Sequence, residues 1–63
     1  MESMIQNLLN GNLKDAKRQA KKFAVGVITD YLHHDLGWTT TKSVAAADYL
    51  KTGKGFQEYC DAE

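Results

Sequence analysis

Apolar residues recur along this chain at the three- and four-residue spacing of amphipathic helices, and five glycines separate the periodic segments. These segments are too short and too helical in their period to be strands. We therefore predict an all-α fold, a compact bundle of four or five short helices without strands. The expected helices cover residues 3–10, 13–23, 25–36, 40–51 and 55–61 of a single domain spanning residues 1–63.

The first two helices have contrasting faces. In the first, the spacing of Ser3 and Gln6 predicts a capping box, and the apolar stripe consists of Met4, Ile5, Leu8 and Leu9. The second helix follows Asn10-Gly11 with Asn12 as its predicted N-cap. We expect its inward face to consist of Leu13, Ala16, Ala20, Phe23 and Ala24. Its opposite face is cationic and consists of Lys14, Lys17, Arg18, Lys21 and Lys22.

The third periodic segment ends at Gly37, and its start is ambiguous. Gly26 disfavours a helix interior, so residues 12–36 form either two helices or one kinked helix. The predicted stripe is Val25, Ile28, Leu32 and Leu36, broadened by Val27 and Tyr31. Trp38 follows in a loop, where a large ring can fill the gap between two helices.

The fourth segment begins at a threonine cap, either Thr39 or Thr40, and ends at Gly53. Its predicted inward side is Thr40, Val44, Ala47 and Leu50, and the run Ala45-Ala46-Ala47 permits close backbone approach. Lys51 lies in the last turn, where a cation complements the helix dipole. In the last helix, we expect Phe56, Tyr59 and a semi-buried Cys60 to pack back on the body.

Length and composition exclude several classes of protein. The chain has 63 residues, of which 43% are hydrophobic and 25% charged, which suits one small globular domain with a thin stability margin. A single cysteine, Cys60, rules out an intramolecular disulfide framework. The start Met1-Glu2 does not resemble a signal peptide, and no apolar run approaches the length of a membrane span. We expect a small soluble domain from a reducing compartment.

Charge is balanced over the chain but separated along it. Eight Lys or Arg residues oppose eight Asp or Glu residues. Residues 12–24 contain five cations and one anion, a net charge of +4, whereas residues 25–63 contain three cations and six anions, a net charge of −3. The remaining −1 comes from Glu2. The neutral total therefore hides a basic helix face and an acidic remainder.

The basic face is the best candidate contact surface. It can dock on an acidic protein, neutralise nucleic-acid phosphates, or serve only to keep the domain in solution. No aromatic residue is interleaved with its cations, as base stacking would require. The segments around Gly37 have the turn length of a helix-turn-helix, but the second helix has few side chains suited to base edges. Tyr49 is expected on the rim, as a binding anchor or as half-buried core.

No motif predicts catalysis or metal binding. His33 and His34 point about 100° apart on a helix, so we expect His33 to be exposed and His34 to pair with Asp30. Nothing in the sequence places a base beside Cys60, and Gly53-x-Gly55 lacks the context of a phosphate loop. The chain offers no room for a ligand pocket, and we predict no enzyme, cofactor or metal.

Residues 10–21 (NGNLKDAKRQAK) and 48–53 (DYLKTG) resemble small accessory proteins encoded by bacteriophages and prophages. Many proteins of that kind bind and disable a host protein, and anti-CRISPR proteins are among them. The resemblance implies a bacterial cytoplasm and a stoichiometric binder, and it assigns no residue a role. The chain lacks the strong acidity of inhibitors that mimic DNA.

Together these features predict a non-enzymatic module that binds a host protein, through Lys14, Lys17, Arg18, Lys21, Lys22 and Tyr49. One alternative is nucleic-acid binding through the same cations. A second is a self-associating structural module, which would follow if the stripe of Met4, Ile5, Leu8 and Leu9 exceeds what one core can bury.

Overall fold

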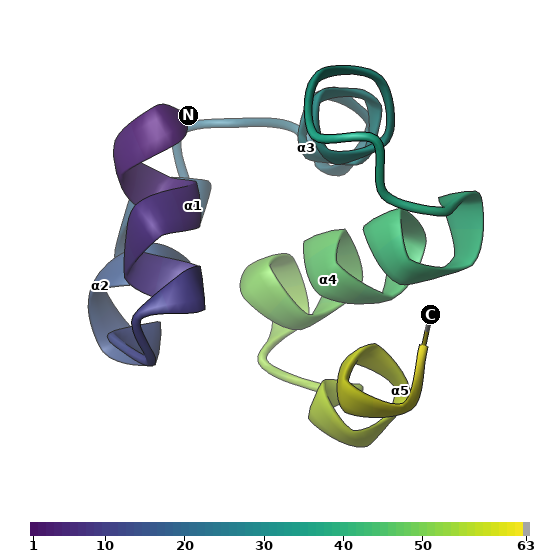
Figure 1. The fold of residues 1–63 in the computed structure, drawn as a ribbon. Coiled ribbons are helices and arrows are strands. Elements are labelled where there is room, and N and C mark those ends of the chain that lie inside the picture. Colours follow the sequence, from purple (N-terminus) through teal and green to yellow (C-terminus); the bar gives the residue numbers. More distant parts are fainter. Residues whose placement is uncertain (63) are drawn as a thin grey trace.

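The longest helix, α4 (Thr40–Thr52), lies in the middle of the molecule, and the other elements pack around it (Figure 1). A computed structural model describes residues 1–62, and within them the fold is all-α and compact, without strands, as predicted. The other elements are α1 (Glu2–Leu9), α2 (Leu13–Ala20), α3 (Val25–Asp30), the π-helical turn η1 (Tyr31–Asp35) and α5 (Phe56–Asp61). No helix of the described chain is long and apolar enough to cross a lipid bilayer.

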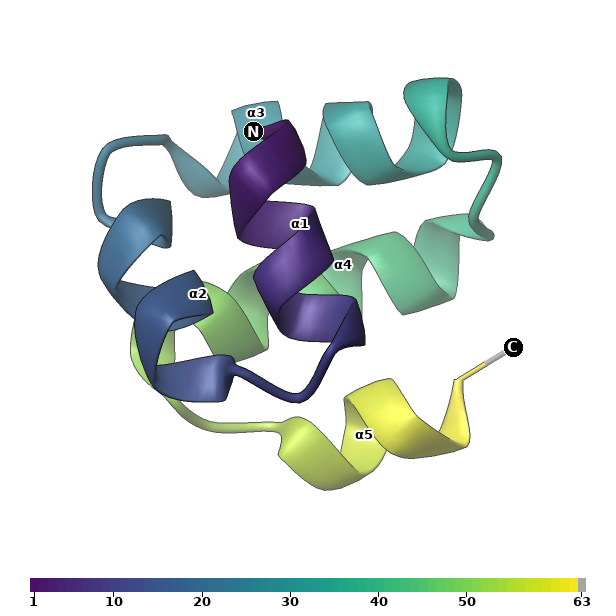
Figure 2. The same ribbon diagram turned by 60° about the vertical axis from the view of Figure 1, so that its left-hand side comes forward.

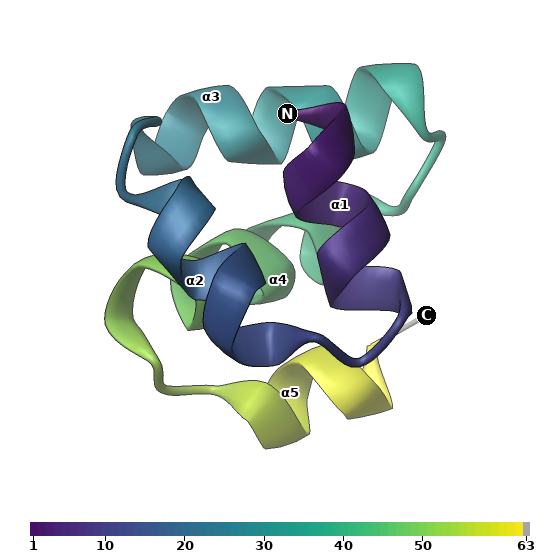
Figure 3. The ribbon, with the colours of Figure 1, turned by 90° about the vertical axis from the view of Figure 1, so that its left-hand side faces the viewer.

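Three layers surround the core. The first is a pair of short helices, α1 and α2, which pack on each other, with α2 also on α4 (Figure 2). A second layer is one rod made of α3 and η1, which crosses above α4 (Figure 3). The third, α5, packs on the other side of α4. The described chain measures 23 × 22 × 20 Å.

Helix α1 begins one residue before the predicted capping box, and the box does not form. Met1 is the N-cap, and no side chain caps the helix. Ser3 Oγ instead accepts a hydrogen bond from Gln19 Nε2 at 3.1 Å, and Asn7 Nδ2 donates to Gln19 Oε1 at 2.7 Å. These side chains are used between helices, so Gln19 ties α1 to α2. The capping-box prediction failed because it considered local partners only.

Residues 12–36 form two helices, which resolves the alternative left open by the sequence. Helix α2 ends at Ala20, three residues earlier than predicted, and Ala24 is extended with φ −71° and ψ 152°. The reason is a long-range cap. Lys51 Nζ, from α4, donates to the carbonyl oxygens of Ala20 at 3.2 Å and Phe23 at 2.7 Å. Carbonyl groups at a helix end need such partners, and here the ammonium of Lys51 supplies them.

The π-helical turn η1 changes which residues of the third segment face the core. Ile28 and Leu32 are fully buried as predicted, whereas Leu36 and Val27 are exposed. A π-turn has more residues per turn than an α-helix, so the predicted 3.6-residue stripe loses its phase by the end of η1 and Leu36 lies off it. Val27 precedes η1 and was expected only at the edge of the stripe. Val25 is also exposed, at the first position of α3. Gly37 follows with φ +73°, a conformation that suits glycine.

Residues from all three layers form the core. On α4, the residues that face this core differ in part from the predicted ones. Thr39 caps α4 by accepting a hydrogen bond from the Lys42 backbone N–H at 3.1 Å. Ser43 is fully buried because its hydroxyl donates to the Thr39 carbonyl oxygen at 2.8 Å, while Thr40 and Val44 are exposed. The apolar residues buried in the described chain are Met4, Ile5, Leu8, Ala16, Ala20, Ile28, Leu32, Ala46, Ala47, Tyr49 and Leu50.

Several predicted core positions lie at or beyond the edge of that core. Leu13 and Phe23 are half-buried, and Ala24 is exposed because it lies in the extended link between α2 and α3. Leu9 is 62% exposed, one position beyond the stripe of Met4, Ile5 and Leu8. The core thus buries three of those four residues, so the stripe leaves one leucine as a basis for self-association.

We predict that Lys51→Met lowers the free energy of unfolding by about 1 kcal/mol, because two carbonyl oxygens at the end of α2 lose a charged donor. Urea denaturation followed by circular dichroism measures the change. Lys54→Met is the matched control, since the Lys54 side chain has no partner among the described residues. Equal stability of the two variants would show that the cap contributes nothing.

Candidate functional site

Four of the five predicted cations surround one hollow on the outer side of α2. The hollow has a volume of about 500 Å³, is open to solvent, and is lined by Lys14, Asp15, Lys17, Arg18 and Lys21. Lys21 joins it from the position just after α2, where the backbone keeps helical angles. Lys22 lies one residue further, in the turn, and does not line the hollow. Four of the predicted basic residues therefore lie together in space, and the group extends one residue past the end of α2.

The charges of this basic face (Lys14, Lys17, Arg18, Lys21 and Lys22) are largely unpaired. Arg18 Nη2 contacts Asp15 Oδ1 at 3.2 Å, but the Arg18 side chain is 73% exposed, and such pairs contribute little energy. Within the described chain, Lys14, Lys21 and Lys22 form no ion pair or side-chain hydrogen bond. Their positive charge is therefore available to a partner. Asp15 adds one negative group inside the same hollow.

Lys17 and Tyr49 are in contact, and Tyr49 is not on the rim. The Lys17 Nζ atom lies 4.9 Å from the centre of the Tyr49 ring, so the cation faces an aromatic surface. Tyr49 is only 5% exposed, because the rings of Phe56 and Tyr59 cover it at centroid distances of 5.0 and 6.4 Å. Of the two alternatives left open, the rim position of Tyr49 is wrong, and the ring lies in the core, deeper than the half-buried position expected. The prediction assumed that α4 is buried on one side only, whereas α5 covers a second side.

A cluster that the sequence did not predict joins Trp38, Lys42 and Tyr59. The Trp38 and Tyr59 rings stack with centroids 6.2 Å apart, and Lys42 Nζ lies 4.3 Å above the Trp38 ring. Trp38 is half-buried in the loop between η1 and α4, as expected for a ring that fills a gap. Only the spacing of Lys42 one turn after Trp38 hinted at this contact. Tyr59 comes from a helix that is distant in sequence.

The histidines and the cysteine do not behave as predicted. His33 is half-buried, and its Nδ1 donates to the Trp38 carbonyl oxygen at 2.8 Å, so this nitrogen carries the proton. His34 is exposed, and no ion pair joins it to Asp30 in residues 1–62. Cys60 is exposed rather than semi-buried. Within those residues no group of three or more His, Cys, Asp or Glu side chains could hold a metal ion.

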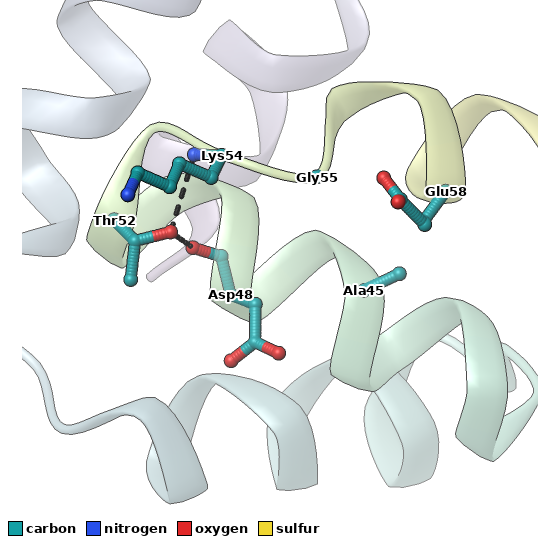
Figure 4. A pocket seen from close by; sticks show the side chains of 6 residues that line it. All are labelled: Ala45, Asp48, Thr52, Lys54, Gly55 and Glu58. Atoms are coloured by element: carbon teal, nitrogen blue, oxygen red, sulfur yellow. Dashed lines mark hydrogen bonds between the residues drawn. The ribbon is translucent and has the colours of Figure 1, made fainter.

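A second hollow lies between α4 and α5, which corrects the expectation that the chain has no room for one. It has a volume of about 530 Å³, and its lining is Ala45, Asp48, Thr52, Lys54, Gly55 and Glu58 (Figure 4). Thr52 Oγ1 donates to the Asp48 carbonyl oxygen at 2.7 Å and accepts from the Lys54 N–H at 3.1 Å. The Asp48 and Glu58 carboxylates come from different helices and point in different directions. The groups in this hollow therefore do not converge on a common point.

The chain matches no known protein family, and comparison with curated proteins and with solved structures gives no significant match. The basic face and the aromatic cluster are thus characterised by their own geometry alone.

We predict that the Tyr59 phenol titrates above pH 10.0. Burial of the ring raises its pKa above the ordinary value of 10.0, and the negative charge of the Cys60 thiolate raises it further. A raised pKa means that the folded state favours the neutral phenol. Its contribution to stability is complete below pH 10.0 and is lost as the pH rises through the folded-state pKa.

An ultraviolet absorbance titration of the wild-type protein, minus that of Tyr59→Phe, isolates this phenol. The expected midpoint lies above 10.0. A midpoint at or below that value would mean that Tyr59 is not packed as described.

Proposed function

We propose that the protein is a non-enzymatic binding module that attaches to an acidic surface of a partner protein through the basic face of α2. The observation that supports this most directly is the hollow lined by Lys14, Lys17, Arg18 and Lys21, in which Lys14 and Lys21 have no partner within the described chain and Arg18 has only an exposed one. Unpaired charge on a small domain is useful for steering and orienting a complementary surface. No cofactor and no catalytic group enter this proposal.

Asp15 favours a protein partner over nucleic acid. Its carboxylate lies among the cations of the hollow, where it would repel a continuous row of phosphates. A protein surface can instead place one basic group opposite Asp15 and acidic groups opposite the lysines. The lining also contains no aromatic ring on which a base could stack. Nucleic-acid binding through the same cations is the alternative that the experiment must separate.

The resemblance of residues 10–21 and 48–53 to phage and prophage accessory proteins supports a bacterial host protein as the partner. We propose stoichiometric binding that inhibits this protein, and components of a defence system such as CRISPR-Cas are candidate targets. In this proposal the protein acts in the bacterial cytoplasm.

We predict that Lys14→Glu/Lys21→Glu abolishes capture of the partner from a nuclease-treated bacterial lysate, whereas Lys54→Glu retains it. Two reversed charges would face acidic groups of the partner, and such contacts cost several kcal/mol. Lys54 is a suitable control because it is exposed and lies outside this hollow. Once the partner is identified, its affinity is measured at increasing salt concentration.

The opposite outcome is binding of nucleic acid. If only nucleic acid is captured, and if duplexes of unrelated sequence bind with an affinity that falls log-linearly with salt, the cations bind phosphates and the protein-binding proposal is wrong.

A further inference from the structure

In the described part of the chain, contacts of aromatic rings hold α5 on the body of the protein. None of its residues is buried, and among the described residues no hydrogen bond or ion pair joins residues 55–62 to residues 1–54. The side-chain contacts that remain are those of the Phe56 ring with Tyr49, and of the Tyr59 ring with Tyr49, Trp38 and the Lys42 ammonium, which lies 6.0 Å from its centre. A helix held in this way belongs to the least stable part of a fold, which opens before the core does.

The surface beneath α5 is aromatic and has a cation at each end. It consists of Trp38 and Tyr49, with Lys42 Nζ at 4.3 Å from the Trp38 ring and Lys17 Nζ at 4.9 Å from the Tyr49 ring. We call these four residues the aromatic docking surface. Removal of α5 would uncover the Tyr49 ring, which is otherwise 5% exposed. Aromatic rings with cations around them are typical anchors of protein interfaces.

The connection to α5 allows it to leave without disturbing α4. Gly53 ends α4 with φ +75°, and Gly55 precedes α5 with φ +84°. Glycine adopts these left-handed angles without strain and is free to leave them. Among the described residues, movement of α5 together with Gly55 therefore breaks the ring contacts described above and keeps the hydrogen bond from the Tyr59 N–H to the Gly55 carbonyl oxygen.

We propose that the aromatic docking surface is a recognition site for a helical segment of a partner protein that carries two aromatic side chains three positions apart. In the structure α5 occupies this site as a built-in competitor. Phe56 and Tyr59 are three positions apart, so they lie on one face of α5 and both reach Tyr49. The helix α5 contains Glu58 and Asp61 and no cation, which suits a surface that has a lysine at each end.

Competition with α5 determines the apparent affinity of a partner helix for the aromatic docking surface. A short tether gives α5 a millimolar effective concentration at the surface, so an outside helix binds only the open fraction of molecules. Any change that undocks α5 raises that fraction and tightens binding of the outside helix by the same factor. The site is separate from the basic face apart from Lys17, which belongs to both, and its test does not require the lysate partner.

The probe is a synthetic peptide of residues 54–62, which contains both aromatic residues and no tryptophan. Trp38 is the only tryptophan of the chain, so its fluorescence reports what stacks on it. We expect the full-length variant Phe56→Ala/Tyr59→Ala to bind one peptide. The wild-type protein should bind it at least about tenfold more weakly, since its own α5 competes. A peptide with both aromatic residues replaced by alanine should not bind.

A second variant keeps both rings and strains only the hinge. Alanine at the left-handed angle of Gly55 disfavours docked α5, so Gly55→Ala should tighten peptide binding by about tenfold. Gly26→Ala is the matched control, because Gly26 lies in α3 without a positive φ and with open space around it. It should leave the peptide affinity at the wild-type value.

Three results would overturn the proposal. The first is no peptide binding by either α5 variant, with helical circular dichroism retained. A second is equal affinity of Gly55→Ala and Gly26→Ala for the peptide. The third is a wild-type dimer that disappears in Tyr59→Ala, which would mean that the α5 of a second copy occupies the surface.

Discussion

Small residues occupy the middle of the buried face of α4, before the larger Tyr49 and Leu50, and the arrangement of the other elements depends on that. Ser43, Ala46 and Ala47 are fully buried there, and α2, α3, η1 and α5 all contact this one helix. The distance between two packed helices is set by the side chains at their contact, so small residues let several backbones approach α4 together. In a chain of 63 residues, this is how one thirteen-residue helix can organise the whole fold.

Small residues also limit how much the core contributes to the free energy of unfolding. An alanine buries little apolar surface, and hydrophobic stabilisation is roughly proportional to the area removed from water. Met4, Ile28, Leu32 and Leu50 supply most of the large buried side chains, and contacts at the edges add to them. Two of these are the Lys51 ammonium at the end of α2 and the rings that hold α5.

Helix positions and most buried residues of α1 could be predicted from the sequence, but the full buried face of α4 could not. Glycines and the Thr39 cap are local signals, and they placed the ends of α4 to within one residue. Burial of Ser43 and of Tyr49 depends instead on partners that fold over α4, and no single stripe describes a helix surrounded on several sides. The phase of the third segment failed at η1 because a π-turn leaves no mark in hydrophobic periodicity. Likewise, the basic face follows from charge along the chain, while the cluster of Trp38 and Tyr59 requires the tertiary fold.

The most direct test of the role of α4 compares one leucine substitution at two alanines that lie two positions apart, Ala45 and Ala47. Ala47 is fully buried against neighbouring helices, whereas Ala45 borders the open hollow between α4 and α5. Urea unfolding should show that Ala47→Leu loses about 1–3 kcal/mol or fails to fold, because overpacking forces the surrounding helices apart. Ala45→Leu should stay within about 0.5 kcal/mol of the wild-type protein. Equal tolerance of leucine at both positions would contradict the account, since close packing around α4 could not then be what holds the helices together.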